Sequence, residues 1–212
     1  MVSRKGQQQL AEGPEQRALQ ARALRTRRAL IDASVLEFSE RGWAGTNTKT
    51  IAARAGVSVG SVYTYFPNKT TLLREVALTF IAQNMDRAIA LLPEESDIGA
   101  DELLEHLRGL AAFVLSGFRR DRGLHDVLRE RRRVDADIRT LWRDQEERLI
   151  RRVAEFLSDI GVPGDTVPVS VCLFGMVDGA IEAHLEGNLV TDDQFVDALA
   201  KSMVAVVETS RR

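Results

Sequence analysis

The 212-residue sequence predicts an all-α protein. Ala, Leu, Arg and Glu are abundant, and these residues favour helices over strands. Apolar residues recur at spacings of three and four, which is typical of helices with one buried face. Only five prolines interrupt the chain, and we find no internal repeat and no convincing strand. The sequence therefore indicates about nine helices, arranged as a small three-helix unit followed by a larger helical domain.

The N-terminal region divides into an arm and a helix. Residues 1–16 are polar, contain Gly and Pro, and lack an apolar period, so this arm is expected to be disordered. The helical pattern begins at about residue 17 and continues to residue 41, with Val35 and Phe38 in its apolar stripe. Gly42 is placed to end this helix as a C-cap.

Two short helices are expected next, at about 48–55 and 58–66. Thr46 or Asn47 can cap the first, and Ser58 can cap the second, because their side-chain oxygens accept hydrogen bonds from the free amides of a first helical turn. A three-residue break containing Gly separates them, as in a helix-turn-helix. Such a pair cannot bury its own apolar faces, so the preceding and following helices must complete a three-helix core.

The same period and similar caps predict the rest of the chain. Asn68 can cap a long connecting helix over 69–90. Five further segments with helical period are expected at 101–118, 123–133, 135–160, 168–186 and 192–210. We therefore divide the chain into the arm 1–16, a helix-turn-helix domain 17–68, and a larger domain 69–212 that begins with the connecting helix.

Composition limits the class of protein. The single cysteine, Cys172, excludes an intrachain disulfide and is typical of a reducing compartment. No apolar run approaches the roughly 20 residues that span a bilayer, and the N-terminus lacks the apolar centre of a signal peptide. We therefore expect a cytoplasmic protein without a membrane partner.

The net charge of −2 conceals an asymmetry. Residues 1–74 carry 12 Lys and Arg against 5 Asp and Glu, whereas residues 75–212 carry 17 against 26. A basic first third beside an acidic remainder indicates one module that binds a polyanion and one with another role.

The informative stretch is TNTKTIAARAGVSVGSVYTYFPNK, residues 46–69. The outward residues of its second helix are small, hydroxylic or aromatic, and none is acidic: Val59, Gly60, Ser61, Tyr63 and Thr64. An ordinary solvent-exposed helix would show Glu and Lys pairs instead. Small and hydroxylic side chains suit close approach to base edges in a DNA major groove. A helical hairpin with half-buried tyrosines and no ligand is the alternative interpretation.

At these residues the sequence resembles the DNA-binding domain of the tetracycline-repressor (TetR) family of bacterial transcriptional regulators. The similar segments are IDASVLEFSERGW, TIAARAGVSVGSVYTYFPNK and TTLL. The resemblance implies base-edge contacts from Val59, Gly60 and Ser61, and many relatives have Lys at the first of these positions, which leaves the bases read open. It implies phosphate contacts from Thr48, Lys49, Tyr63, Tyr65 and Lys69. Thr46 and Ser58 complete the predicted DNA-binding set.

The resemblance also implies a homodimer that binds a palindromic operator in double-stranded DNA. A stripe of small residues, Gly175, Gly179 and Ala183, would let another helix approach closely, and Leu199 and Met203 of the last helix are assigned to the same interface. The stripe could instead pack within its own chain. One short recognition helix makes too few contacts for tight specific binding, which favours two half-sites.

A small-molecule effector of unknown identity is implied as well, and no other cofactor or metal is expected. Its candidate pocket residues are Phe113, Phe118, Trp142, Phe156, Cys172 and Met176. Further candidates are Phe174 and, as polar points, His106, His125 and His184. Aromatic residues at helical spacing are also common in plain cores. The shortage of polar candidates favours a largely apolar effector.

Other basic and acidic clusters allow alternatives. Residues 129–133 read RERRR, either a second phosphate patch or a solvated helix face. A flexible basic arm following the DNA backbone or minor groove is better supported by Arg4, Lys5, Arg17, Arg22, Arg25, Arg27 and Arg28.

Two other classes of protein fit the sequence less well than a regulator does. Asp178, Glu182 and Glu186 with His184 could form a carboxylate–histidine site, but no metal-ligand spacing, nucleophile elbow or phosphate loop is present. An architectural DNA binder is disfavoured by the acidic second part. The predicted function is a ligand-responsive transcriptional repressor, not an enzyme. Effector binding would act through the connecting helix.

Overall fold

The computed structural model describes residues 13–93, 98–187 and 189–211. Over these ranges the chain forms nine helices and no strand, which confirms the predicted fold class. The helices are α1 (Pro14–Gly45), α2 (Thr48–Ala55), α3 (Val59–Tyr65), α4 (Lys69–Ile89), α5 (Ala100–Arg120), α6 (Arg122–Val134), α7 (Ala136–Asp159), α8 (Val167–Gly187) and α9 (Asp192–Ser210).

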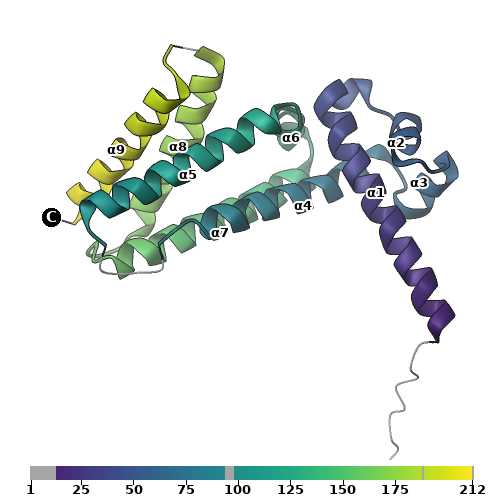
Figure 1. The fold of residues 1–212 in the computed structure, drawn as a ribbon, viewed down its shortest axis with the longest axis horizontal. Helices are drawn as coiled ribbons and strands as arrows, with labels where there is room; N and C mark the ends of the chain where they lie inside the picture. The colour runs from purple at the N-terminus through teal and green to yellow at the C-terminus, as the bar shows by residue number, and fades with distance from the viewer. Residues whose placement is uncertain (1–12, 94–97, 188, 212) are drawn as a thin grey trace, which may run out of the picture.

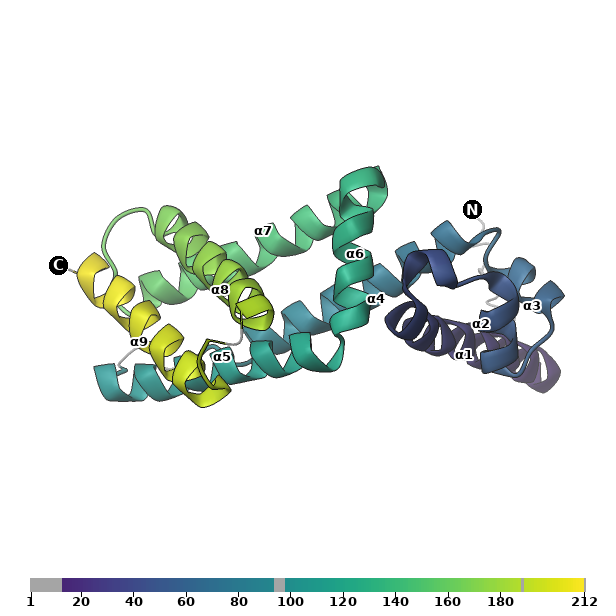
Figure 2. The same ribbon diagram turned by 90° about the horizontal axis from the view of Figure 1, so that it is seen from above.

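The molecule is elongated, with α1, α2 and α3 at one end and α5, α8 and α9 towards the other (Figure 1). Helices α4 and α7 lie side by side along its length. Helix α6 crosses the junction between the two ends and contacts α1 (Figure 2). The junction is therefore built by α6 as well as by the connecting helix α4.

Three clusters of buried apolar side chains follow this arrangement. The first lies within the helix-turn-helix unit and includes Leu30, Ile51, Val62, Phe66 and Leu72. The largest is formed by α5, α7, α8 and α9 at the other end. Between them, α1, α4, α6 and α7 share a cluster that contains Phe38, Leu73, Val76, Ile81, Leu124, Leu128 and Ile138. Because buried packing resists separation, this shared cluster links the N-terminal unit to the larger domain.

Helix α1 differs from its prediction at both ends. It begins at Pro14, a favourable first helical position for proline, so residues 14–16 are helical and not part of a disordered arm. Residues 1–12 of that arm lie outside the described residues. Gly42 leaves the helical conformation with φ 65° and ψ −177°, as expected for a glycine at a helix break, but a further turn extends α1 to Gly45.

The other helices begin and end within a few residues of their predicted bounds, and α9 coincides with its prediction. Of the two candidate caps for α2, the structure selects Asn47, whose side chain accepts hydrogen bonds from the amides of Lys49 and Thr50. The Thr50 hydroxyl in turn accepts a hydrogen bond from the Asn47 amide, and the two interactions form a capping box.

Among the described residues, α8 is the one helix long and apolar enough to cross a membrane by length and composition. The expectation that no segment approaches this length does not hold for α8. Length and composition are weak evidence, because apolar helices of soluble proteins pass the same test. One face of α8, with Leu173 and Ile181, is buried in the largest core cluster.

Candidate functional site

The turn between α2 and α3 is set by a few backbone interactions. Gly56 adopts a left-handed conformation with φ 67°, and its amide and that of Val57 bond back to carbonyls of α2. This is the usual way in which a glycine ends a helix. Ser58 then caps α3, because its hydroxyl accepts a hydrogen bond from the Ser61 amide at 3.1 Å. Both caps fix α3 relative to α2.

Helix α3 has a buried face and an uncharged exposed face. Val62 and the following Phe66 are buried, at 0% and 2% exposure. Gly60, Tyr63 and Thr64 are exposed, and the remaining residues of α3 are partly buried: Val59, Ser61 and Tyr65. No side chain of α3 is charged. An exposed helix without charge is well suited to close contact with base edges and gives no repulsion towards phosphates.

Tyr63 and Thr48 connect the two helices of the motif at the surface. Their hydroxyl oxygens are 3.2 Å apart. Tyr63 is 53% exposed, and Lys49 on α2 is exposed too. The structure therefore brings a phenol and a hydroxyl together beside the uncharged face, with the exposed Lys49 next to Thr48 in the chain, where phosphates of a bound duplex would lie.

Two predicted DNA contacts have other partners in the structure. Thr46 is 1% exposed, and its hydroxyl donates to the carbonyls of Glu37 and Gly42 at 2.9 and 2.8 Å. Thr46 is therefore buried and hydrogen-bonded to the end of α1, and the prediction that it contacts DNA was wrong.

Lys69 is the second of these corrections. Its ammonium donates to the carbonyls of Trp43 and Thr46 at 2.7 and 2.8 Å and lies 4.1 Å from the centre of the Trp43 ring. Burial, together with the charge of Arg131, lowers the pKa of Lys69. The ammonium holds the start of α4 against the end of α1, whereas the prediction was that it contacts a DNA phosphate.

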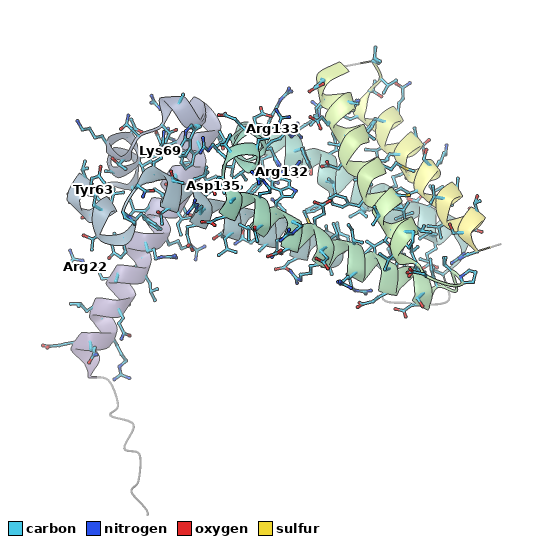
Figure 3. All side chains as sticks on the ribbon, turned by 180° about the vertical axis from the view of Figure 1, so that it is seen from behind. Arg22, Tyr63, Lys69, Arg132, Arg133 and Asp135 are labelled. Atoms are coloured by element: carbon cyan, nitrogen blue, oxygen red, sulfur yellow. The ribbon has the colours of Figure 1, made fainter. Side chains whose placement is uncertain are left out.

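The basic residues of the N-terminal region lie on a helix. Arg17, Arg22, Arg25 and Arg28 are exposed along α1, which corrects the prediction of a flexible basic arm for this stretch. Arg22 and Tyr63 lie at the same end of the molecule (Figure 3). Arg27 instead pairs with Glu75 at 2.6 Å. Arg4 and Lys5 lie outside the described residues.

The larger domain contains an apolar cavity of about 160 Å³. Of the predicted pocket residues, Phe113, Phe118, Trp142 and Phe156 line it, as do Phe174 and His125. Four other candidates do not: Cys172 is exposed, Met176 packs against the core, and His106 and His184 lie elsewhere. Cys172 and Met176 were placed on the wrong face of α8, because helical spacing alone does not show which side of an apolar helix meets a cavity.

His125 is held between aromatic rings on the cavity wall. It stacks on Phe118 with ring centres 4.1 Å apart and meets the edge of Phe80 at 5.0 Å. Burial lowers the pKa of His125 to about 4, with the charge of Asp121 opposing this and those of Arg129 and Arg120 adding to it. The ring is therefore neutral at pH 7 and contributes an uncharged aromatic surface.

The predicted dimer interface divides into two groups. Gly175, Gly179 and Ala183 are exposed on α8, and a Cβ added at either glycine would meet nothing within 4 Å. The stripe therefore does not pack within the described part of its own chain. Leu199 and Met203 are 4% and 3% exposed in the largest core cluster. Their assignment to the interface was wrong, because the face of α9 that carries them packs inward.

The RERRR segment is a solvated helix face only in part, because Glu130 and Arg133 are exposed whereas its other arginines contact neighbouring groups. Arg129 forms an ion pair with Glu182 of α8. Arg131 lies over the Trp43 ring at 4.4 Å, and Arg132 lies over the Trp142 ring at 4.9 Å. The arginines of α6 therefore contact the N-terminal unit, the cavity wall and α8, a role that a run of arginines in a sequence does not reveal.

The carboxylate–histidine alternative is not supported by the geometry. The His184 Nε2 atom lies 2.9 Å from Asp192, and its ring stacks on Phe195. No group of three metal-ligating side chains occurs within the described residues.

A helix-turn-helix with an uncharged, exposed second helix and basic flanks is the arrangement expected of a DNA-binding domain. Residues 30–76 match the family described as "Bacterial regulatory proteins, tetR family". The helix-turn-helix domain of this chain is therefore similar to the DNA-binding domain of the TetR family.

Individual proteins show the same similarity. The "Probable acrEF/envCD operon repressor" of Escherichia coli (strain K12) is 40% identical over 58 residues, which cover 27% of this chain and 26% of that relative. A Mesorhizobium loti MAFF303099 protein assigned to the TetR family shares the fold with a TM-score of 0.73 at 23% identity, over 87% and 98% of the two chains. A Saccharomonospora viridis protein assigned as a transcriptional regulator, in complex with choline, has a TM-score of 0.68 at 22% identity, over 82% and 93% of the two chains.

Proposed function

We propose that this protein is a cytoplasmic repressor that binds a palindromic operator as a homodimer and is released by a small, largely apolar effector. The observation that carries the proposal is the exposed, uncharged face of α3, flanked by Tyr63, Thr48 and Lys49. Exclusion of polymerase from a promoter by the bound dimer is the expected output.

The dimer rests on the exposed faces of α8 and α9. Along α8 most exposed residues before Glu186 are small or apolar, and they include Val171, Cys172, Gly175, Gly179 and Ala183. Those of α9 include Ala198, Ser202 and Ala205. Two copies of such a surface can approach closely through a twofold axis. A second protomer supplies the second α3, so that two major grooves about one helical turn (34–36 Å) apart, or somewhat more, can be read.

The effector response rests on the cavity and on α6. His125 of α6 and Phe80 of α4 both line the cavity, and α6 also contacts α1. An effector that favours a different placement of α6 would therefore alter the position of α3. Release requires that the effector binds the DNA-incompetent arrangement more tightly than the competent one. The choline bound in the Saccharomonospora viridis protein supports a small-molecule site in this fold.

The test is the affinity for a duplex selected from random sequences, measured by fluorescence anisotropy. Tyr63→Phe removes one hydrogen-bonding group and should weaken binding to every duplex by about fivefold per half-site. Ser61→Ala should change the order of preference among duplexes. Gln83→Ala, an exposed change on α4, serves as the control. Unaltered affinity and preference in both α3 variants at physiological salt would show that α3 is not the reading helix.

A further inference from the structure

The cavity of the larger domain has one charged group among its described lining residues. The wall is otherwise apolar, apart from the amide of Asn84 and the neutral ring of His125. Asp178, on α8, provides the carboxylate. A charged side chain at the wall of an apolar cavity is costly unless it is paired, so this residue requires an explanation.

Nothing in the described part of the chain pairs directly with Asp178. The nearest basic groups interact with it only through longer-range charge, and both have other contacts: Arg129 binds Glu182, and Arg132 lies over the Trp142 ring. Burial raises the pKa of Asp178, and the neighbouring charge of Glu182 adds to this while the two arginines oppose it. The carboxylate is thus held at the cavity wall without a hydrogen bond or ion pair.

The rest of this region also favours a positive ligand. Burial and the charge of Asp178 raise the pKa of Glu146 on α7, against the effect of Arg132. Aromatic rings line the same cavity as Asp178: Phe113, Phe118, Trp142 and Phe174. Faces of such rings attract cations that have lost their water. No Lys or Arg is among the lining residues that the structure describes, so an anionic ligand would meet no opposite charge on this part of the wall.

We infer that the effector is an organic cation, with a compact apolar body against the aromatic wall and its positive charge at Asp178. This inference rests on the proposed function, because it specifies the ligand of the same effector cavity. The volume of about 160 Å³ limits the body to one small ring or a few alkyl groups, since an apolar cavity of about this size accommodates a benzene molecule.

Two probes of the same shape separate charge from apolar fit. Phenyltrimethylammonium carries a positive charge, and tert-butylbenzene is its neutral isostere. Titration calorimetry with the full chain should give at least about tenfold tighter binding of the cation, as a desolvated cation–π contact and a carboxylate together predict. Asp178→Asn should abolish this preference without lowering the unfolding temperature, because it removes an unpaired, partly buried charge. Asp126→Asn, an exposed change on α6, should preserve the preference.

Several outcomes would overturn the inference. These are equal or tighter binding of tert-butylbenzene, an undiminished preference for the cation in Asp178→Asn, or tighter binding of 3-phenylpropionate than of either probe. The effect of each probe on operator affinity tests the proposed function separately. If only the neutral probe releases the protein from operator DNA, the proposed repressor function stands and the cationic effector is rejected. If the cation binds in a way that depends on Asp178 but leaves operator affinity unchanged, the cation site stands and the proposed effector response is rejected.

Discussion

Two lysines of the helix-turn-helix have separable roles. Lys69 donates to two carbonyls, so Lys69→Met should lower the free energy of unfolding by about 1–3 kcal/mol by leaving these acceptors without a donor. Lys49 is exposed, so Lys49→Met should leave stability unchanged and reduce the salt dependence of DNA binding by about one phosphate contact per site. Urea unfolding and salt titration of binding measure these effects. If Lys69→Met instead reduced the salt dependence of DNA binding and left stability unchanged, Lys69 would be a phosphate contact.

His125 predicts a pH dependence of stability. Its pKa is about 4 in the folded protein, whereas an unfolded chain would have the ordinary value of about 6.5. Between these values the unfolded state binds a proton that the folded state excludes, so stability falls as pH falls from about 6.5 to 4, by about 3 kcal/mol at most. His125→Phe should flatten this part of the profile in urea unfolding at successive pH values. An unchanged slope would show that the ring is protonated in the fold.

Single residues also show where sequence interpretation ends. The caps at Asn47, Ser58 and Asn68 were predictable, because capping depends on residues two or three positions away. The hydrogen bond from Thr46 to Glu37 was not, because it joins residues nine positions apart. In the sequence Asp178 belonged to a possible carboxylate–histidine site, and only the position of α8 in the fold places it on a cavity wall.

At the level of helices, α6 and α1 pack so closely that adding one methyl group at their contact tests the packing. A Cβ at Gly123 would lie 2.0 Å from the Ser39 carbonyl oxygen, so Gly123→Ala must separate the two helices. We expect a loss of about 1–3 kcal/mol of stability and a change in DNA affinity. Gly109→Ala, on an exposed part of α5 with free space, should stabilise the protein by up to about 1 kcal/mol. Thermal unfolding compares the two, and equal effects would reject close packing at Gly123.

The bounds of most helices follow from local pattern, whereas their contacts do not. Periodicity and caps predict α2, α3 and α9 well because the signal lies within each segment. Which face of α9 is buried depends on the neighbouring helices. Leu199 and Met203 were predicted at the dimer interface for this reason, but they lie in the core. The same holds for Arg131, whose partner Trp43 is distant in the sequence.

For the whole molecule, the exposed face of α8 predicts a dimer that can be disrupted without unfolding the chain. Gly179→Glu adds charge to open space, so each protomer should remain folded while the assembly becomes monomeric in sedimentation experiments. Operator affinity should fall on the order of a hundredfold, because one half-site contact is lost. Gly109→Glu is the matched control and should remain dimeric. A dimer that survives Gly179→Glu would place the interface elsewhere.

The central claim is that two copies of α3 read DNA together. Selection of random duplexes by the purified protein at physiological salt tests it most directly. The predicted result is a palindromic consensus whose half-sites are separated by about one helical turn or somewhat more. Enrichment of a single, non-palindromic site, or of no sequence at all, would contradict the account.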